Sequence, residues 1–407
     1  MNILYISGFL PSQFSEHLCN AKLVYALSDA GYDVDVISKP YSGPEYNAEW
    51  TAPWLQLKSH TYEVDYELGN KLERFIDIMY SSICMRIMPI DGIRWARRAL
   101  AKALEMHKRK HYDAVLTRAP SDIFHIVGYR FSKMTGVKWI ANWNDPAATI
   151  WPAPYTHRFS FIRQKIENAF AVKILKAADI NTFPSKRLCD HFIRHYPFLK
   201  QKHNVIIPHI GLLERLMPAP LARPEYKTLR MCHSGNLSKE RNPELLFAAI
   251  EGLCRQGYNI ELDIMGYVND YTASLIAKYS LEKQVRFIGS HTYIDALQIM
   301  SSYDVLVLIE AQMHEGIFFP SKFTDYVQLD RSILAISPPT GFINDMISAY
   351  GGGVCTDNTN MESIRDGIIL LYKAWYSGKL NKQFDTSRLY MNFAPQTVVD
   401  IYNRILK

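Results

Sequence analysis

Residues 315–336 read EGIFFPSKFTDYVQLDRSILAI, and no other stretch predicts more about this chain. Pro320 fits the first position of a helix, because its fixed φ is already helical and its missing N–H needs no partner there. Phe319 then becomes the N-cap, and phenylalanine offers no side-chain acceptor to the free N–H groups of the first turn. We therefore expect a helix start that is left open for an anion, with Lys322 adding positive charge. Asp325, one turn further along the same face, could accept hydrogen bonds from a ribose diol.

The same letters have a plainer interpretation. Lys322 and Asp325 could form a surface pair at i, i+3 on an ordinary helix, a contact worth about 0.3 kcal/mol. The stretch by itself does not decide between an anion site and a surface pair. It does predict a helix followed by a buried strand, SILAIS at residues 332–337.

Short β-branched runs alternate with helical patterns along the whole chain, which predicts βα units and parallel sheets. In the first half the expected strands lie at residues 2–7, 33–38, 113–117, 138–142, 179–183 and 204–208. In the second half they lie at residues 229–235, 259–266, 284–289, 304–310 and 332–337. The fold class is therefore α/β, with two Rossmann-like doubly wound domains, and we expect them to face a central cleft that holds the ligand.

A chain of 407 residues is long enough for two domains. Pro218, Pro220 and Pro224 disfavour both helix and central strand, so we place the interdomain linker at residues 213–228. This gives an N-terminal domain at residues 1–212 and a C-terminal domain at residues 229–393. The amphipathic segment 394–407 could end the second domain or cross back onto the first, and we assign it to the first.

Composition and charge favour a globular protein of a reducing compartment. Hydrophobic residues make up 48% of the chain, and the net charge of +6 suits an anionic small molecule or membrane as well as nucleic acid. No nucleic-acid-binding signature accompanies that charge. The six cysteines lack CxxC or metal-type spacing, which favours free thiols.

The start MNILYISGF lacks the features of a signal peptide, and residues 75–90 are too short an apolar run to span a bilayer. We expect a cytoplasmic protein.

A second candidate site follows the linker, where residues 233–250 read HSGNLSKERNPELLFAAI. Gly235 makes the turn after a strand, and a helix opens at Pro243 with Asn242 as its N-cap. Arg241 stands just before that cap, where its planar guanidinium could bind a phosphate through two hydrogen bonds. The alternative is that Arg241 and the neighbouring Lys239 are solvated loop charges.

These segments, in this order, resemble the donor domain of retaining glycosyltransferases with the GT-B fold, of the family 4 type (glycosyltransferase group 1). The resemblance rests on the Gly235 to Arg241 segment, on LDIMG, on the stretch VRFIGSHTYIDALQIMSSYDVLVLIE, and on PSKFTDYVQLDRSILAI. The first half, with NILYIS, LSDAGYDVDVIS, YDAVLTRAP and WIANWNDP, is similar to the acceptor domain of those enzymes.

The resemblance implies a set of donor-binding residues. Arg241 matches a diphosphate-binding lysine, Asp325 the second of two paired glutamates that holds the ribose, and Lys322 a lysine in a Pro-x-Lys variant of that motif. Donor contacts are accordingly expected from Gly8, Gly235, Arg241, Glu315, Ser321, Lys322 and Asp325.

Three positions depart from the family pattern. Asn236 replaces a second phosphate-binding arginine, Asp325 is shorter than glutamate, and Ile317 stands where the first glutamate belongs. Glu315 is the nearest carboxylate to that missing glutamate.

In the first half, Arg118 and Asp145 each follow a predicted strand and are the candidate catalytic residues. Arg118 could steady a leaving phosphate or an acceptor anion, and Asp145 could orient an acceptor hydroxyl, although an ordinary loop role explains both. His209 is expected to be structural. The basic helix at residues 93–111 could lie on an anionic membrane with Trp95 at the interface, but a solvated helix face explains it better.

The resemblance implies a retaining glycosyltransferase that moves a sugar from a nucleotide diphosphate donor to a carbohydrate acceptor, perhaps lipid-linked, in the synthesis of surface polysaccharide or glycoconjugate. We expect no cofactor and no metal, since no DxD-like cluster is apparent, and no nucleic-acid partner. Peripheral attachment at the inner face of the membrane is an alternative to a purely cytoplasmic location. Two other functions stay open: a nucleotide-sugar epimerase of the same fold, and a non-catalytic partner subunit.

Overall fold

The computed structural model describes residues 1–8, 15–40, 57, 59–65, 70–85, 92–118, 123–221 and 227–407. The chain forms two compact units. Unit 1 comprises Met1–Pro208 and Val398–Lys407, and unit 2 comprises His209–Thr397. The proline-rich segment proposed as the linker lies within the range of unit 2, and its Pro224 falls outside the described residues.

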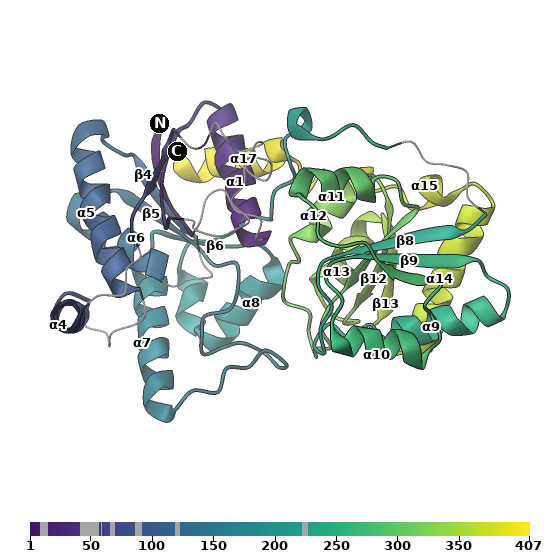
Figure 1. Ribbon diagram of the computed structural model, residues 1–407. Coiled ribbons are helices and arrows are strands. Elements are labelled where there is room, and N and C mark those ends of the chain that lie inside the picture. The colour runs from purple at the N-terminus through teal and green to yellow at the C-terminus, as the bar shows by residue number, and fades with distance from the viewer. Residues whose placement is uncertain are drawn as a thin grey trace. The chain divides into compact units, whose positions relative to one another are not determined.

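Unit 1 contains a seven-stranded parallel sheet in the order β3-β2-β1-β4-β5-β6-β7 (Figure 1). Its strands are β1 (Asn2–Ile6), β2 (Asp33–Ser38), β3 (Thr61–Glu63), β4 (Ala114–Arg118), β5 (Lys138–Asn142), β6 (Ile180–Phe183) and β7 (Asn204–Ile206). Its helices are α1 (Ser15–Asp29), α4 (Lys71–Met79), the π-helix η2 (Tyr80–Met85), α5 (Ile93–Lys110), α6 (Ile123–Thr135), α7 (Phe161–Ala177), α8 (Lys186–His195) and the 3₁₀ turn η3 (Pro197–Gln201).

Unit 2 contains a six-stranded parallel sheet in the order β10-β9-β8-β11-β12-β13. Its strands are β8 (Leu229–Ser234), β9 (Ile260–Met265), β10 (Val285–Phe287), β11 (Val305–Ile309), β12 (Ser332–Ser337) and β13 (Gly353–Asp357). Its helices are η4 (Glu214–Leu216), α9 (Glu244–Arg255), α10 (Asp270–Lys278), α11 (Tyr293–Met300), α12 (Lys322–Gln328), α13 (Phe342–Tyr350), α14 (Met361–Tyr376), α15 (Leu380–Gln383) and α16 (Ser387–Tyr390).

The predicted fold class of two doubly wound α/β domains is confirmed. The central strands β4 and β11 are buried along their whole length, as expected for a parallel sheet that has helices on both faces. In each sheet the strand order reverses beside the first strand of the unit, which is β1 in unit 1 and β8 in unit 2. The reversal lies between β1 and β4 in unit 1, and between β8 and β11 in unit 2. Ligands of such sheets bind outside the carboxyl ends of the strands at this reversal.

Sequence patterns missed two strands, β3 and β13. β3 has only three residues and is largely exposed, so it shows no apolar run. β13 has the sequence GVCTD, which also lacks a continuous apolar run.

The last helix, α17 (Pro395–Leu406), contributes to unit 1 from Val398 onward. The Nζ of Lys138 in β5 donates to the carbonyl of Ile405 at 2.5 Å, and the hydroxyl of Tyr32 bonds to Asn403. These bonds fix α17 against the sheet of unit 1.

Trp95 on the basic helix α5 is 1% exposed and packs edge-on against Phe124, with ring centroids 5.2 Å apart. The structure therefore contradicts the alternative in which Trp95 reaches a membrane interface and agrees with the favoured interpretation, because the apolar face of α5 packs into the core of unit 1. Among the described residues, no helix combines the length and the hydropathy that a membrane crossing requires.

Candidate functional site

The turn after β8 and the first turn of α12 meet at the carboxyl edge of the second sheet. The Nζ of Lys322 donates to the backbone carbonyl of Ser234. Gly235 has φ +119, and a β-carbon there would lie 2.5 Å from Lys322 Nζ. Glycine is thus needed at position 235 both for its backbone conformation and for the space that the lysine occupies.

Helix α12 begins later than the sequence suggested. Its first residue is Lys322 and its N-cap is Ser321, whose side chain makes no capping hydrogen bond. The placement of Pro320 at the first helical position, with Phe319 as N-cap, is therefore wrong. Phe319 is buried in an aromatic cluster with its ring centroid 4.2 Å from that of Phe342. The need to bury Phe319 holds this segment in the core and delays the helix start.

His209 belongs to the same aromatic cluster. It is buried, and its ring centroid lies 4.7 Å from that of Phe319.

Because α12 has only seven residues, its dipole is a weak source of positive potential. The side chains of Lys322 and Arg241 supply the charge instead. Burial first, and then the charge of Arg241, lower the pKa of Lys322 to about 7. Burial is the largest cause of the lowered pKa of His233 and of the raised pKa of Glu310, and the charge of Arg241 adds a smaller lowering to both. Two cations held near each other, one of them desolvated, make a site that an anion would stabilise.

Asp325 lies one turn beyond Lys322 on α12. Its Oδ1 accepts a hydrogen bond of 2.7 Å from the hydroxyl of Tyr293, the first residue of α11. Its charge also raises the pKa of Lys322, opposing the larger effects of burial and Arg241. The structure therefore brings Gly235, Arg241, Lys322 and Asp325 into one electrostatic neighbourhood.

Glu310 is a member of this neighbourhood that sequence reasoning missed. It follows β11 directly, is 9% exposed, and its Oε2 has no hydrogen-bond partner. Burial raises the pKa of Glu310 to about 7, against the lowering effect of the Ser337 hydroxyl and of Arg241. Its position at the end of the predicted strand DVLVLIE was the available signal.

The loop between β8 and α9 is fixed by amide side chains. The Oδ1 of Asn236 accepts from the backbone N–H of Tyr267 at 3.1 Å, which links this loop to the turn after β9. Asn242 Oδ1 accepts from the N–H of Glu244 at 2.9 Å, but α9 begins at Glu244 with Pro243 as its N-cap. The prediction of Asn242 as N-cap and Pro243 as the first helical residue is therefore one residue early. These bonds set the loop that carries Arg241.

Glu315 and Ser321 lie between β11 and α12. Glu315 is half-buried and precedes Gly316, whose backbone bridges to Gly341 at the start of α13. The N–H of Phe342 donates to the Gly316 carbonyl at 2.8 Å. Glu315 is thus anchored beside α13, whereas Ser321 adjoins Lys322.

Gly8, Arg118 and Asp145 all belong to unit 1. Gly8 follows β1 and packs so closely on His17 that a β-carbon would lie 2.7 Å from its Nε2. Burial, followed by the charge of Lys39, lowers the pKa of His17 to about 4, so the imidazole is neutral. Residues 9–14 fall outside the described part of the chain.

Arg118 is the last residue of β4 and is 6% exposed. Burial raises the pKa of Tyr402 on α17 to about 12, and the charge of Arg118 opposes that rise. Asp145 is half-buried in the turn after β5. Gly8 and Arg118 therefore flank the point of unit 1 where the strand order reverses, and Asp145 lies one strand away.

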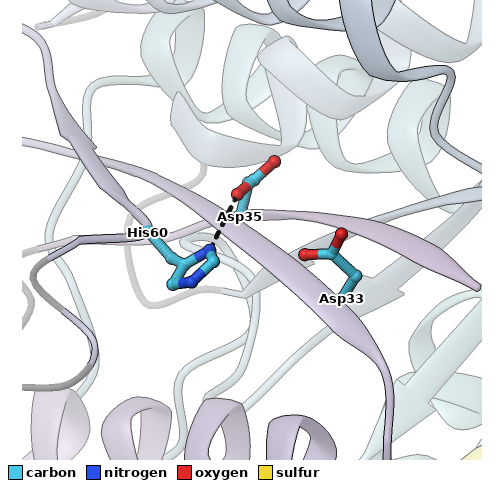
Figure 2. Close-up of side chains that lie close together, drawn as sticks. All are labelled: Asp33, Asp35 and His60. Atoms are coloured by element: carbon cyan, nitrogen blue, oxygen red, sulfur yellow. Dashed lines mark hydrogen bonds and ion pairs between the residues drawn. The ribbon is translucent and has the colours of Figure 1, made fainter.

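The expectation that the chain has no DxD-like cluster is wrong, because Asp33 and Asp35 have that spacing in β2. With His60 they form a group whose ligand atoms lie within 4.8 Å of one another (Figure 2). Lys110 Nζ already bridges the two carboxylates, at 2.6 Å from Asp33 Oδ1 and 2.7 Å from Asp35 Oδ2. Burial would raise the pKa of Asp35, but hydrogen bonds from Lys110 and Tyr112 lower it overall. The group lies at the amino end of β2, the opposite sheet edge from the ligand side, and we interpret it as a structural charge cluster.

Residues 223–387 match the family model described as glycosyl transferases group 1. That range contains Gly235, Glu310, Lys322 and Asp325. No curated protein matches the chain by sequence.

Solved structures show the same fold along the whole chain. A glycosyltransferase from Rickettsia africae is 14% identical with a TM-score of 0.66, covering 100% of this chain and 97% of that one. Sucrose-phosphate synthase from Thermosynechococcus elongatus is 13% identical with a TM-score of 0.68, covering 99% and 98%. HepE from Anabaena, solved with UDP and glucose, is 14% identical with a TM-score of 0.66, covering 100% and 99%. The expected GT-B fold is confirmed.

Proposed function

We propose that the protein transfers a sugar from a nucleoside diphosphate donor held by unit 2, and the match of residues 223–387 to the family model described as glycosyl transferases group 1 supports this proposal. One observation carries the proposal. The ammonium of Lys322 lies over Gly235 at the point where the strand order reverses, and the charge of Arg241 acts on it.

A diphosphate at this point would relieve an unfavourable arrangement. In the free protein, burial and Arg241 lower the pKa of Lys322 to about 7, so much of its charge is lost at neutral pH. An anion placed between the two cations would restore the protonated ammonium and hold the guanidinium through charge-assisted hydrogen bonds. The same groups would stabilise the negative charge that develops on the departing diphosphate, which is electrostatic catalysis.

Three further side chains of unit 2 are candidates for contacts with the ribose and the sugar of the donor. Asp325, one turn beyond Lys322 and held by Tyr293, is our candidate for binding the ribose diol. Glu315 and Ser321 are our candidates on the side of the transferred sugar. HepE was solved with UDP and with UDP-glucose, which supports a uridine nucleotide as the first donor to test here.

We propose retention of configuration, without a metal ion or cofactor, and a carbohydrate acceptor that is free or lipid-linked in surface polysaccharide or glycoconjugate synthesis. Arg118 and Asp145, at the carboxyl edge of the first sheet, are the candidates for the acceptor side. Arg118 would bind an acceptor or leaving-group anion, and Asp145 would orient the attacking hydroxyl.

The test is thermal denaturation of the full chain with UDP, GDP, ADP and their sugars, with and without EDTA. A ligand at a hundred times its dissociation constant should stabilise the protein by about 2.7 kcal/mol. We expect one nucleotide to do so, unaffected by EDTA, and to lose its effect when Arg241 is replaced by alanine. Equal and negligible shifts with every nucleotide would overturn the proposal.

Glu310 supports a second candidate function, that of a nucleotide-sugar epimerase. A carboxyl with a pKa of about 7 beside the proposed diphosphate site is a group that elimination chemistry can use as acid or base. Incubation of the donor alone separates the two functions. An epimerase converts it to an epimer, whereas a glycosyltransferase leaves its stereochemistry unchanged until an acceptor is added.

A further inference from the structure

Helix α4 continues into η2 as one helical segment, residues 71–85, with an inverted amphipathic arrangement. Its polar side faces the protein. Asp77 and Ser81 are buried, and Arg94 Nη2 of α5 donates to Asp77 Oδ2 at 2.8 Å. Arg97 lies 3.3 Å from the other Asp77 oxygen. The polar side of α4 thus packs against the arginines of α5.

The apolar side of the segment faces solvent. The large apolar side chains and their exposed fractions are Leu72 68%, Phe75 58%, Ile76 39%, Ile78 45%, Met79 41% and Ile83 64%. All but Ile78 follow the i, i+3, i+4, i+7 spacing that places residues on one helix face. Figure 1 shows α4 at the outside of unit 1, away from its sheet. A contiguous exposed apolar face of this kind marks an interaction site.

The segment is a formed helix and not a frayed end. Asn70 and Glu73 make a reciprocal capping box, in which Glu73 N–H donates to Asn70 Oδ1 at 3.0 Å and Asn70 N–H donates to Glu73 Oε2 at 3.0 Å. Arg94 also lies 3.4 Å from Glu73. The helix is therefore held in place with its apolar face presented outward.

The charges on the exposed side of α4 indicate which kind of partner binds there. Lys71 and Arg74 are exposed, whereas the two acids of α4, Glu73 and Asp77, are paired with arginines of α5. The outer side of α4 therefore presents apolar and cationic groups together, the combination that binds an anionic lipid surface.

We propose that the α4–η2 segment, residues 71–85, docks the protein on an anionic bilayer. The apolar side chains would enter the headgroup boundary, and Lys71 and Arg74 would contact lipid phosphates. The ion pairs between α4 and α5 hold this surface in position. This surface does not depend on the identity of the donor or of the acceptor.

The test is flotation of the full chain with two kinds of vesicle, phosphatidylcholine alone and phosphatidylcholine mixed with phosphatidylglycerol. The unmodified chain should float with the anionic vesicles, and raising the salt from about 0.1 M to about 1 M should weaken that binding. Replacing Phe75 and Ile76 together by serine should reduce the vesicle-bound fraction by at least about tenfold, because both side chains bury apolar area in the proposed complex.

The matched control replaces Leu370 and Tyr376 by serine, because these are exposed apolar side chains on α14, at 43% and 80%. This control should float like the unmodified chain. Equal flotation of the Phe75→Ser, Ile76→Ser variant would overturn the proposal. So would a dimer in sedimentation that this variant dissociates while vesicle binding is absent, which would assign the surface to a second copy.

Discussion

The ammonium of Lys322 donates to the carbonyl of Ser234 and lies 2.5 Å from where a β-carbon on Gly235 would sit. A residue at the start of α12 is thereby held against the turn after β8. The strand order reverses beside that turn, and in sheets of this kind the ligand binds at such a reversal. A glycine, a desolvated lysine and a nearby arginine at this point are suited to a diphosphate.

Replacing Lys322 by methionine should separate ligand binding from stability. The buried lysine has a lowered pKa, so its contribution to stability is present above pH 10.5 and is lost as the pH falls towards 7. Methionine avoids that loss and keeps most of the side-chain volume. The free variant should therefore gain about 1 kcal/mol in unfolding free energy at pH 7, while the nucleotide-induced shift disappears.

Lys373→Met is the control for this experiment, because Lys373 is exposed on α14. It should leave both the stability and the ligand shift unchanged. An undiminished ligand shift in Lys322→Met would remove this lysine from the site.

Gly235→Ala should weaken donor binding more than it weakens the fold. The new methyl group would displace Lys322 Nζ, and a non-glycine residue at φ +119 is strained by about 1 to 2 kcal/mol. Gly257→Ala provides the matched control, since Gly257 has φ +90 and nothing within 4 Å of the added β-carbon. Calorimetric titration should show a loss of nucleotide affinity only in Gly235→Ala. Equal affinities in the two variants would mean that the space beside Lys322 is irrelevant to the ligand.

Asp325→Asn should abolish discrimination between a ribonucleotide and its 2′-deoxy analogue. The carboxylate of Asp325 accepts from Tyr293 and would accept from the ribose hydroxyls, whereas an amide offers a single acceptor oxygen. The unmodified protein should prefer the ribonucleotide by about tenfold, the value of one hydrogen bond to a charged group. Persistence of that preference in Asp325→Asn would place the ribose elsewhere.

Asp77→Ala should loosen α4 without affecting unit 2. It removes the carboxylate that pairs with Arg94 and Arg97, and breaking a mostly buried ion pair costs about 3 kcal/mol. Hydrogen exchange should therefore accelerate at residues 71–83. Exchange in α14 serves as the internal reference, and unchanged protection of α4 would show that these ion pairs do not hold it.

Local patterns predicted the fold well because parallel strands buried on both faces read as continuous β-branched runs. β11 occurs where DVLVLIE predicted a strand, and β12 occurs where SILAIS predicted one. β3 and β13 were missed since neither carries such a run. The start of α12 was misplaced because burial of Phe319 in an aromatic cluster is a tertiary effect, which overrides the preference of Pro320 for a first helical position.

Local sequence patterns also predicted part of the candidate site. Gly235, Lys322 and Asp325 were recognisable because each stands at a fixed offset from a strand or helix boundary. Tyr293, which holds Asp325, gives no local signal, since the contact joins α11 to α12 across 32 positions of sequence. The sequence also could not predict that the polar side of α4 faces the protein, because only the contacts with Arg94 and Arg97 show which side of the helix points inward.

The most direct measurement is the number of protons taken up when a nucleotide sugar binds. Its diphosphate has no ionisation near neutrality, so uptake reports on the protein. The pKa of Lys322 is about 7 in the free protein and should rise beside an anion. Titration calorimetry at pH 8 in buffers of different ionisation enthalpy should therefore give uptake of about one proton per site, and affinity should fall as the pH rises above 7. Lys322→Met should show neither effect. Binding with no proton uptake in the unmodified protein would contradict the claim that Lys322 meets the diphosphate.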